Sequence, residues 1–299
     1  MSDFLTLVMP LQKRADITVD DFYDYWLNAH ITLPARFPGI DSIFLHMTSF
    51  DQQRFPRVPN TSHRPEERDD FQGVPEATFA AQPDLQVFID AATVQWQDGI
   101  NFLREEISYR GIGGNSQTVI DRLPQPAPDG NESHVRHLVF LRKRPAVETE
   151  AARAFVTGAL VPAWSKADKL LKLRSHLFEV VEGTLDHPGV QQFKPIERQY
   201  QACVEVVFPD ETAQDAFASS QAWRETTAGL GEHFEAVHAV RATRTITSKY
   251  KGQITLAGAR GVQVADIIHK LNAKSQTQDA CTALFVNDQK PHMSFYHSK

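Results

Sequence analysis

Within the first 50 residues, the spacing of apolar positions changes from strand-like to helical and back to strand-like. Residues 4–12 (FLTLVMPLQ) and 40–50 (IDSIFLHMTSF) have the composition of β-strands. Between them, Phe22 and Trp26 recur at helical spacing. Thr18 precedes them, and an acidic residue follows it three positions later, which resembles a helix capping box. The pattern predicts a strand, a helix and a second strand.

The next 70 residues complete a six-element unit. Residues 51–73 are polar and rich in proline, which predicts a long loop, and 74–80 (VPEATFA) have strand composition. Apolar positions over 84–108 predict a helix, and 116–121 (SQTVID) a fourth strand. The predicted order is strand-helix-strand-strand-helix-strand.

The same pattern returns in the second half of the chain. Residues 137–144 (HLVFLRKR) repeat the pattern of residues 7–14 (LVMPLQKR), and further pairs follow in the same order at offsets of 127 to 130 residues. These pairs are Tyr25 and Phe155, His46 and His176, Glu76 and Glu205, and Trp96 and Trp223. A sustained internal period indicates a duplicated unit.

The duplication predicts an α+β fold of tandem ferredoxin-like repeats. In each repeat both helices cover one face of a four-stranded antiparallel sheet, and the other face stays bare. Two repeats can cover their bare faces together, as a pseudo-dimeric α/β barrel that holds a small ligand. We expect the first repeat at residues 1–122, a linker at 123–135, the second repeat at 136–247 and a C-terminal extension with a helix at 248–299.

Composition and charge exclude several classes of partner. The net charge is −6 without a long basic run, which argues against nucleic acid. No apolar run reaches the roughly 18 residues of a membrane span, and the N-terminus lacks the features of a signal peptide. Cys203 and Cys281 are the only cysteines, so we expect free thiols in a cytoplasmic protein.

One helix carries a motif with a family resemblance. The pattern Phe22-x-x-Tyr25-Trp26-x-x-x-His30, followed by LPARFPGI, is similar to the EthD-like members of the dimeric α/β-barrel superfamily. The stretch SSQAWRET at 219–226 resembles their second helix. That superfamily includes cofactor-free monooxygenases, cyclases, isomerase-like proteins, aldoxime dehydratases and haem enzymes, so the resemblance implies the fold more closely than the reaction.

The resemblance implies that His30 lies at the end of the first helix and faces the barrel cavity. At the 130-residue offset, Leu160 replaces His30, so only the first repeat keeps a group that exchanges protons near neutral pH. The alternative is that His30 only caps the helix. Tyr25 could donate a hydrogen bond to the substrate or be a core aromatic, and Trp26 is a candidate substrate contact that could equally be core packing.

Alternation along the second strand of each repeat predicts further cavity residues. If the aliphatic residues face the helices, Phe44 and His46 point into the barrel, as do Arg174 and His176. Glu76 opens the third strand and could act as a base if burial raised its pKa. The alternatives are a retained structural role for the histidines and a solvated Glu76.

We therefore expect a cofactor-independent lyase, dehydratase, cyclase or isomerase. His30, Tyr25 and His46 are its expected catalytic residues, and Trp26, Phe44, Glu76, Arg174 and His176 its expected substrate contacts. The substrate is expected to be small and hydrophobic, aromatic or polyketide-like. The alternatives are a haem enzyme, a cofactor-free monooxygenase and a non-catalytic binding protein. No metal is expected, and the extension is expected to support a homodimer.

Overall fold

A computed structural model describes residues 5–51, 54–111, 114–126, 131–132, 134–182 and 189–285. The parts of the predicted repeats, linker and extension at residues 1–4, 52–53, 112–113, 127–130, 133, 183–188 and 286–299 lie outside this range. Within it, no helix is long and apolar enough to cross a membrane.

The first half of the chain begins with two short strands and a helix whose capping box is present at Thr18 and Asp21. Its elements are β1 (Leu5–Val8), β2 (Leu11–Lys13), α1 (Val19–Asn28), β3 (Ile40–Ser49), β4 (Gly73–Phe79), α2 (Gln82–Ala91), α3 (Thr93–Gly99), β5 (Leu103–Glu106), β6 (Tyr109–Gly111) and β7 (Ser116–Asp121). Short 3₁₀ turns lie at His30–Thr32, Pro34–Arg36 and Glu67–Asp69.

The second half repeats this order. Its elements are β8 (Asn131–Glu132), β9 (Val135–Lys143), α4 (Thr149–Phe155), a π-helical turn at Val156–Leu160, α5 (Val161–Trp164), β10 (Lys172–Leu177), a 3₁₀ turn at Ile196–Arg198, β11 (Ala202–Phe208), α6 (Glu211–Ala218), α7 (Gln221–His233) and β12 (Phe234–Tyr250). The extension contains β13 (Gln253–Ile254), α8 (Leu256–Arg260), α9 (Val262–Lys270), a 3₁₀ turn at Lys274–Thr277 and α10 (Asp279–Thr282).

The described strands join one sheet in the order β5-β2-β4-β3-β12-β9-β11-β10-β7. The long strand β12 pairs with β9 of its own half and then with β3 of the first half. At the end of the first half, β6 pairs with β1 of its own half, and β7 pairs with β10 of the second half. Each half thus ends in strands that pair with both halves, and the sheet closes on itself as a barrel.

The predicted helix at 84–108 is wrong in its last third. The helices end at Gly99, and Leu103 starts strand β5, which pairs with β2. The predicted fourth strand at 116–121 exists, but it pairs with the other half of the chain. Both differences have one cause: the unit ends in three short strands, of which β5 and β6 pair with the first half and β7 with the second, and β5 had been counted with the helix.

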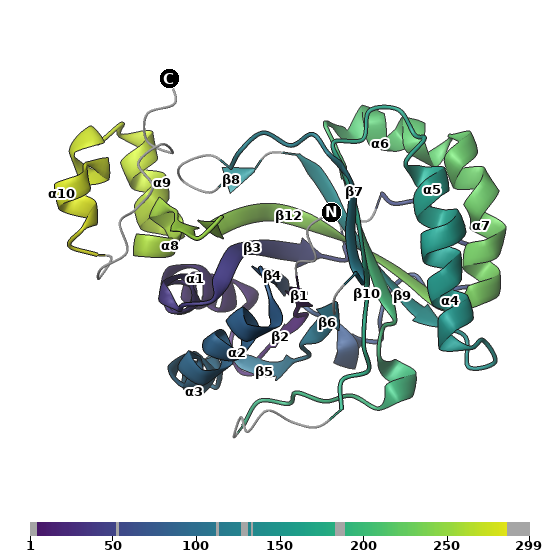
Figure 1. Ribbon diagram of the computed structural model, residues 1–299, viewed down its shortest axis with the longest axis horizontal. Helices are drawn as coiled ribbons and strands as arrows, with labels where there is room; N and C mark the ends of the chain where they lie inside the picture. Colours follow the sequence, from purple (N-terminus) through teal and green to yellow (C-terminus); the bar gives the residue numbers. More distant parts are fainter. Residues whose placement is uncertain are drawn as a thin grey trace.

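Helices cover the outside of the barrel at two places. In Figure 1, α1, α2 and α3 lie on one side of the sheet, and α4, α5, α6 and α7 lie on the opposite side. One hydrophobic core lies under each set of helices, and a third apolar cluster, with Tyr109, Phe140 and Phe178, lies inside the barrel. The sheet therefore has an inner face and two helix-covered outer faces.

The C-terminal extension packs on the first half of the chain. The backbone N–H of Gln263 donates to Asn28 Oδ1 at 2.8 Å, and Arg36 Nη2 donates to the carbonyl of Ala259 at 2.7 Å. Leu256, Val262 and Ile268 join the core under α1, next to the segment that follows the helix. The extension thereby holds the end of α1, where His30 lies.

Candidate active site

The structure divides the predicted site residues between two faces of the first-half sheet. On β3, Leu45 lies on the helix-covered face, and His46 lies on the inner face of the barrel, fully buried. His30 and Trp26 lie on the helix-covered face. The expected trio of His30, Tyr25 and His46 is therefore not brought together, and His30 does not face the barrel interior. The resemblance placed this imidazole on the wrong side of the sheet.

Residues predicted to point into the barrel lie there and are engaged with one another. Arg174 forms an ion pair with Glu76 of the other half and donates to Thr6 Oγ1 at 2.9 Å. Burial disfavours a charged Glu76, but Arg174 and other nearby groups, among them Lys172, together outweigh burial and lower the carboxyl pKa. The alternative of a solvated Glu76 is thus not observed, and neither is the raised pKa that a general base would need.

The two equivalent histidines have hydroxyl partners. His46 Nδ1 lies 3.0 Å from Thr245 Oγ1, and His176 Nδ1 lies 3.0 Å from Ser116 Oγ. Burial lowers the pKa of both imidazoles, and the positive charge of Arg174 adds to this at His176. Uncharged imidazoles that bond to a strand of the opposite half have the features of structural bridges.

A second group of charges lies on the inner face. Glu205, the counterpart of Glu76, forms ion pairs with Arg136 and, at 3.0 Å, with Lys172. The ammonium of Lys172 also lies 5.3 Å from the ring centre of Phe44. Glu76 and Glu205 therefore each neutralise cations, and the predicted polar interior is a paired network.

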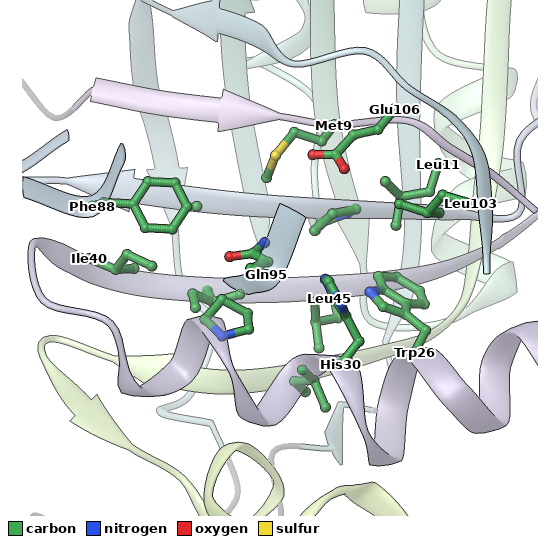
Figure 2. A pocket seen from close by; sticks show the side chains of 15 residues that line it. Met9, Leu11, Trp26, His30, Ile40, Leu45, Phe88, Gln95, Leu103 and Glu106 are labelled. Atoms are coloured by element: carbon green, nitrogen blue, oxygen red, sulfur yellow. The ribbon is translucent and has the colours of Figure 1, made fainter. Parts of the chain in front are cut away.

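A pocket opens on the helix-covered face of the first half. It lies between β2, β3, β4 and β5 on one side and the end of α1, α2 and α3 on the other, with a free volume of about 480 Å³ that includes its open mouth. The lining is mostly apolar, and its polar members are His30, Gln95 and Glu106. Figure 2 shows Glu106 beside Met9 on one side of the pocket and His30 with Trp26 on the other.

His30 is held in the pocket wall by a carboxylate. Helix α1 ends at Asn28, and His30 begins a 3₁₀ turn that is followed by Pro34. The His30 side chain is 9% exposed, and its Nδ1 lies 2.8 Å from Asp98 Oδ2. The ring packs on Phe102 with 4.8 Å between centroids. No described residue bonds to Nε2 of His30.

Asp98 is itself fixed by two donors. Its Oδ1 accepts a hydrogen bond from Tyr25 Oη at 2.6 Å and another from Asn101 Nδ2 at 3.1 Å. Burial opposes ionisation of Asp98, but the hydrogen bonds from His30 and Tyr25 lower its pKa below the ordinary value. Burial raises the pKa of Tyr25, and its bond to Asp98 adds to the effect. Tyr25 therefore stays a hydrogen-bond donor to an ionised carboxylate that orients the imidazole.

Comparison with known proteins agrees with this fold. Residues 14–103 match the EthD domain family. The matched segment lies in the first half of this chain. The match runs from the end of β2 to the start of β5 and includes α1, His30 and Asp98. No curated protein matches the chain in sequence.

Similar solved structures extend the likeness over both halves. A putative monooxygenase from Fusobacterium nucleatum has 9% identity and a TM-score of 0.50, and the match covers 85% of this chain and 97% of that one. A putative monooxygenase from Lactobacillus acidophilus has 11% identity and a TM-score of 0.46, with 83% and 97% covered. An anthrone oxidase-like protein has 11% identity and a TM-score of 0.48, with 83% and 95% covered. At 9% identity and a TM-score of 0.50, the likeness to the first of these structures shows the fold alone, the predicted dimeric α/β barrel.

The expected lyase or isomerase class is wrong. The similar structure with a TM-score of 0.50 is named a putative monooxygenase, which is neither a lyase nor an isomerase. The sequence motif around His30 indicates proton transfer, and proton transfer alone does not distinguish these classes.

Three polar residues at the pocket that contains His30, called the EthD-domain pocket below, were not predicted from the sequence: Gln95, Asp98 and Glu106. The first two lie on α3, and all three fall in the segment that had been predicted as one long helix. Burial raises the pKa of Glu106 to about 7. A usable signal was present, because Glu106, Ser108 and Arg110 alternate in a strand-like pattern.

In its described lining, the pocket that contains His30 offers no cationic side chain to the propionates of a haem, the cofactor kept as an alternative. A haem needs a slot for its ring and an axial ligand, and its two propionates favour cationic partners. No arginine or lysine lines the pocket, and the carboxyl of Glu106 faces the space. Among the described residues, no group of three or more His, Cys, Asp or Glu side chains is arranged to hold a metal ion.

Proposed function

We propose that the pocket of the EthD domain removes a proton from an activated carbon of a small apolar molecule, and that the carbanion then reacts with O₂. The observation that carries this proposal is the imidazole of His30, held by Asp98 in the wall of an apolar pocket. The chain would then be a cofactor-independent oxygenase. The fold shared with the Fusobacterium nucleatum putative monooxygenase, at a TM-score of 0.50, is consistent with this.

His30 serves as the base in this scheme. With Nδ1–H donating to ionised Asp98, Nε2 is the basic nitrogen and accepts the substrate proton. Asp98 then stabilises the imidazolium, and the bond from Tyr25 Oη fixes the carboxylate in position. Tyr25 is a positioning residue here, because its hydroxyl bonds to Asp98.

The apolar lining serves the second step. Leu45, Leu103 and Phe88 line the free space with apolar side chains, which favours a delocalised carbanion and a reaction with O₂ over reprotonation. For a CH₂ group next to an aromatic ring, the balance is CH₂ + O₂ → C=O + H₂O. The carbon loses four electrons and O₂ gains four, so no external reductant is needed.

Anthrone is a suitable probe, because it is an apolar carbon acid whose oxidation to anthraquinone is followed by absorbance and O₂ uptake. We expect the wild-type chain to oxidise anthrone faster than buffer does. His30→Leu, which installs the residue of the second half, should lower the rate by about 10²-fold. Asp98→Asn should lower it less, since the imidazole remains.

His269→Leu is the matched control, because His269 lies exposed on α9, far along the extension. It should leave the rate unchanged. A wild-type rate equal to that of buffer, or a His30→Leu variant as active as the wild type, would contradict the proposal. Anthrone that binds and is recovered unchanged would indicate a binding protein instead.

A further inference from the structure

The last strand of the first half carries three polar side chains on a face that helices cover. Glu106 lies opposite Leu11 of β2, and Arg110 lies opposite Leu7 of β1, both apolar core residues of the helix-covered face. Ser108 lies between them, and strand alternation gives it the same face. A face that only packed against helices would carry apolar residues at these positions.

These residues line a second compartment next to the pocket. It has a free volume of about 380 Å³, open solvent included, and it shares Met9, Phe88, Gln95 and Glu106 with the first. Its other walls include Leu7, Ile89 and Trp96, and its polar end consists of Ser108 and Arg110. The two compartments adjoin at these shared walls and are together called the groove below; His30 lines only the first, and Arg110 lines only the second.

Neither Glu106 nor Arg110 has a side-chain partner among the described residues. The backbone of Arg110 is fixed, since its carbonyl accepts from Glu179 N at 3.0 Å, but its exposed guanidinium forms no described ion pair or hydrogen bond. In the second half the strand register gives Arg241 the place of Arg110, and Arg241 donates to Glu211 at 2.9 Å. The first half thus leaves uncompensated a guanidinium that the second half neutralises.

We propose that the compartment beyond Glu106 binds an anionic group of the substrate at Arg110, so that the substrate class is an apolar, aromatic acid. The apolar part would lie along Met9 and Phe88 toward His30, and a carboxylate or sulfonate would reach the guanidinium and the Ser108 hydroxyl. This inference rests on the proposed function only in assigning the same groove to the substrate.

Glu106 is compatible with an anion in the groove. Because burial raises its pKa to about 7, a large share of the molecules carry it uncharged near neutral pH. An uncharged carboxyl can donate a hydrogen bond to the ligand. Above that pH the carboxylate repels an anion, so binding of the acid should weaken there.

Two fluorescent probes with one skeleton test the inference directly. 8-Anilinonaphthalene-1-sulfonate carries an anionic group, and N-phenyl-1-naphthylamine is the same molecule without the sulfonate. We expect Arg110→Ala to raise the Kd of the sulfonate about tenfold, the effect of one charge-assisted contact of about 1.4 kcal/mol. The Kd of the neutral probe should change less than about twofold, and Arg110→Lys should restore part of the difference.

Two further variants locate the probes. Arg122→Ala removes another exposed arginine, on the chain just after β7, and should change neither Kd. Gln95→Trp fills the shared wall of the two compartments and should weaken both probes. Sulfonate binding that survives Gln95→Trp, or that is insensitive to Arg110→Ala, would overturn the inference. Equal weakening of both probes by Arg110→Ala would overturn it too.

The outcome is separable from that of the proposed function. Probe binding needs no turnover, so a chain that discriminates between the probes but does not oxidise anthrone refutes the oxygenase alone. A chain that oxidises anthrone but binds both probes equally refutes the anion site alone.

Discussion

Phe79 packs on Phe88 in the first half of the barrel with 5.5 Å between ring centroids, and Phe208 packs on Phe217 in the second half with 5.4 Å. Around this common pair the two helix-covered faces diverge. At the matching sequence offsets, Leu160 stands in place of His30, Trp164 in place of Pro34 and Ala222 in place of Gln95. In the matching strand register, Val237 stands in place of Glu106. The two halves share the scaffold and differ in the residues that face the space between sheet and helices.

Aromatic side chains fill that space in the second half. Trp164 lies fully buried against Phe217 and Trp223, and its Nε1 donates to Thr226 at 3.0 Å. Phe55, from the long loop of the first half, packs on the same cluster. The comparison teaches that a pocket in this fold depends on which side chains occupy the helix-covered face.

The largest effect is expected from removing Trp164, which fills the space between sheet and helices in the second half. We expect Trp164→Ala to lower the free energy of unfolding by about 3–5 kcal/mol, because it leaves a cavity in a closely packed core and Thr226 without its donor. Urea unfolding measures this. Trp96→Ala is the control, since Trp96 is half-buried beside the open groove and should cost much less. Equal losses at the two positions would contradict the contrast between a filled and an open face.

The carboxyl of Glu106 should make stability depend on pH in a defined window. Its pKa in the fold is about 7 and its ordinary value is 4.5, so between these values the unfolded chain releases a proton that the folded chain keeps. The unfolded state is then favoured as pH rises, and stability falls from about pH 4.5 to 7 by roughly 1–3 kcal/mol.

Glu106→Gln should remove that contribution, because an amide does not titrate. Unfolding free energies at pH 5 and pH 7.5 measure it in both proteins, and the wild type should lose more between the two pH values than the variant does. Identical pH profiles would show that Glu106 is ordinarily solvated.

The smallest expected effect concerns the N-terminal caps of α1 and α4, the first helices of the two halves. Thr18 caps α1 and accepts a hydrogen bond from Asp21 N at 3.0 Å, whereas Glu148 at the start of α4 makes no such bond. Thr18→Ala should cost about 1 kcal/mol of unfolding free energy, and Glu148→Ala should stay within about 0.5 kcal/mol. Similar costs at both positions would mean that the capping box does not stabilise α1.

Local pattern was enough for the duplicated fold and for the inner face of the barrel. Alternation along β3 and β10 placed His46 and Arg174 on the inner face, because in a strand the side-chain direction follows from position alone. The pattern could not place the last strand, whose first residues, Leu103 to Glu106, continue the apolar spacing of a helix. It also could not pair His30 with Asp98, 68 residues away in sequence.

By itself, the sequence determined the repeat, the elements of each half and the loss of the imidazole at Leu160, since these depend on residue type and spacing along the chain. Only the tertiary structure decided which face of the sheet His30 occupies, that Asp98 holds it, and that Arg174 and Glu76 neutralise each other. These outcomes depend on contacts between segments distant in sequence. Such contacts form only when the shared strands β12 and β7 bring the two halves together.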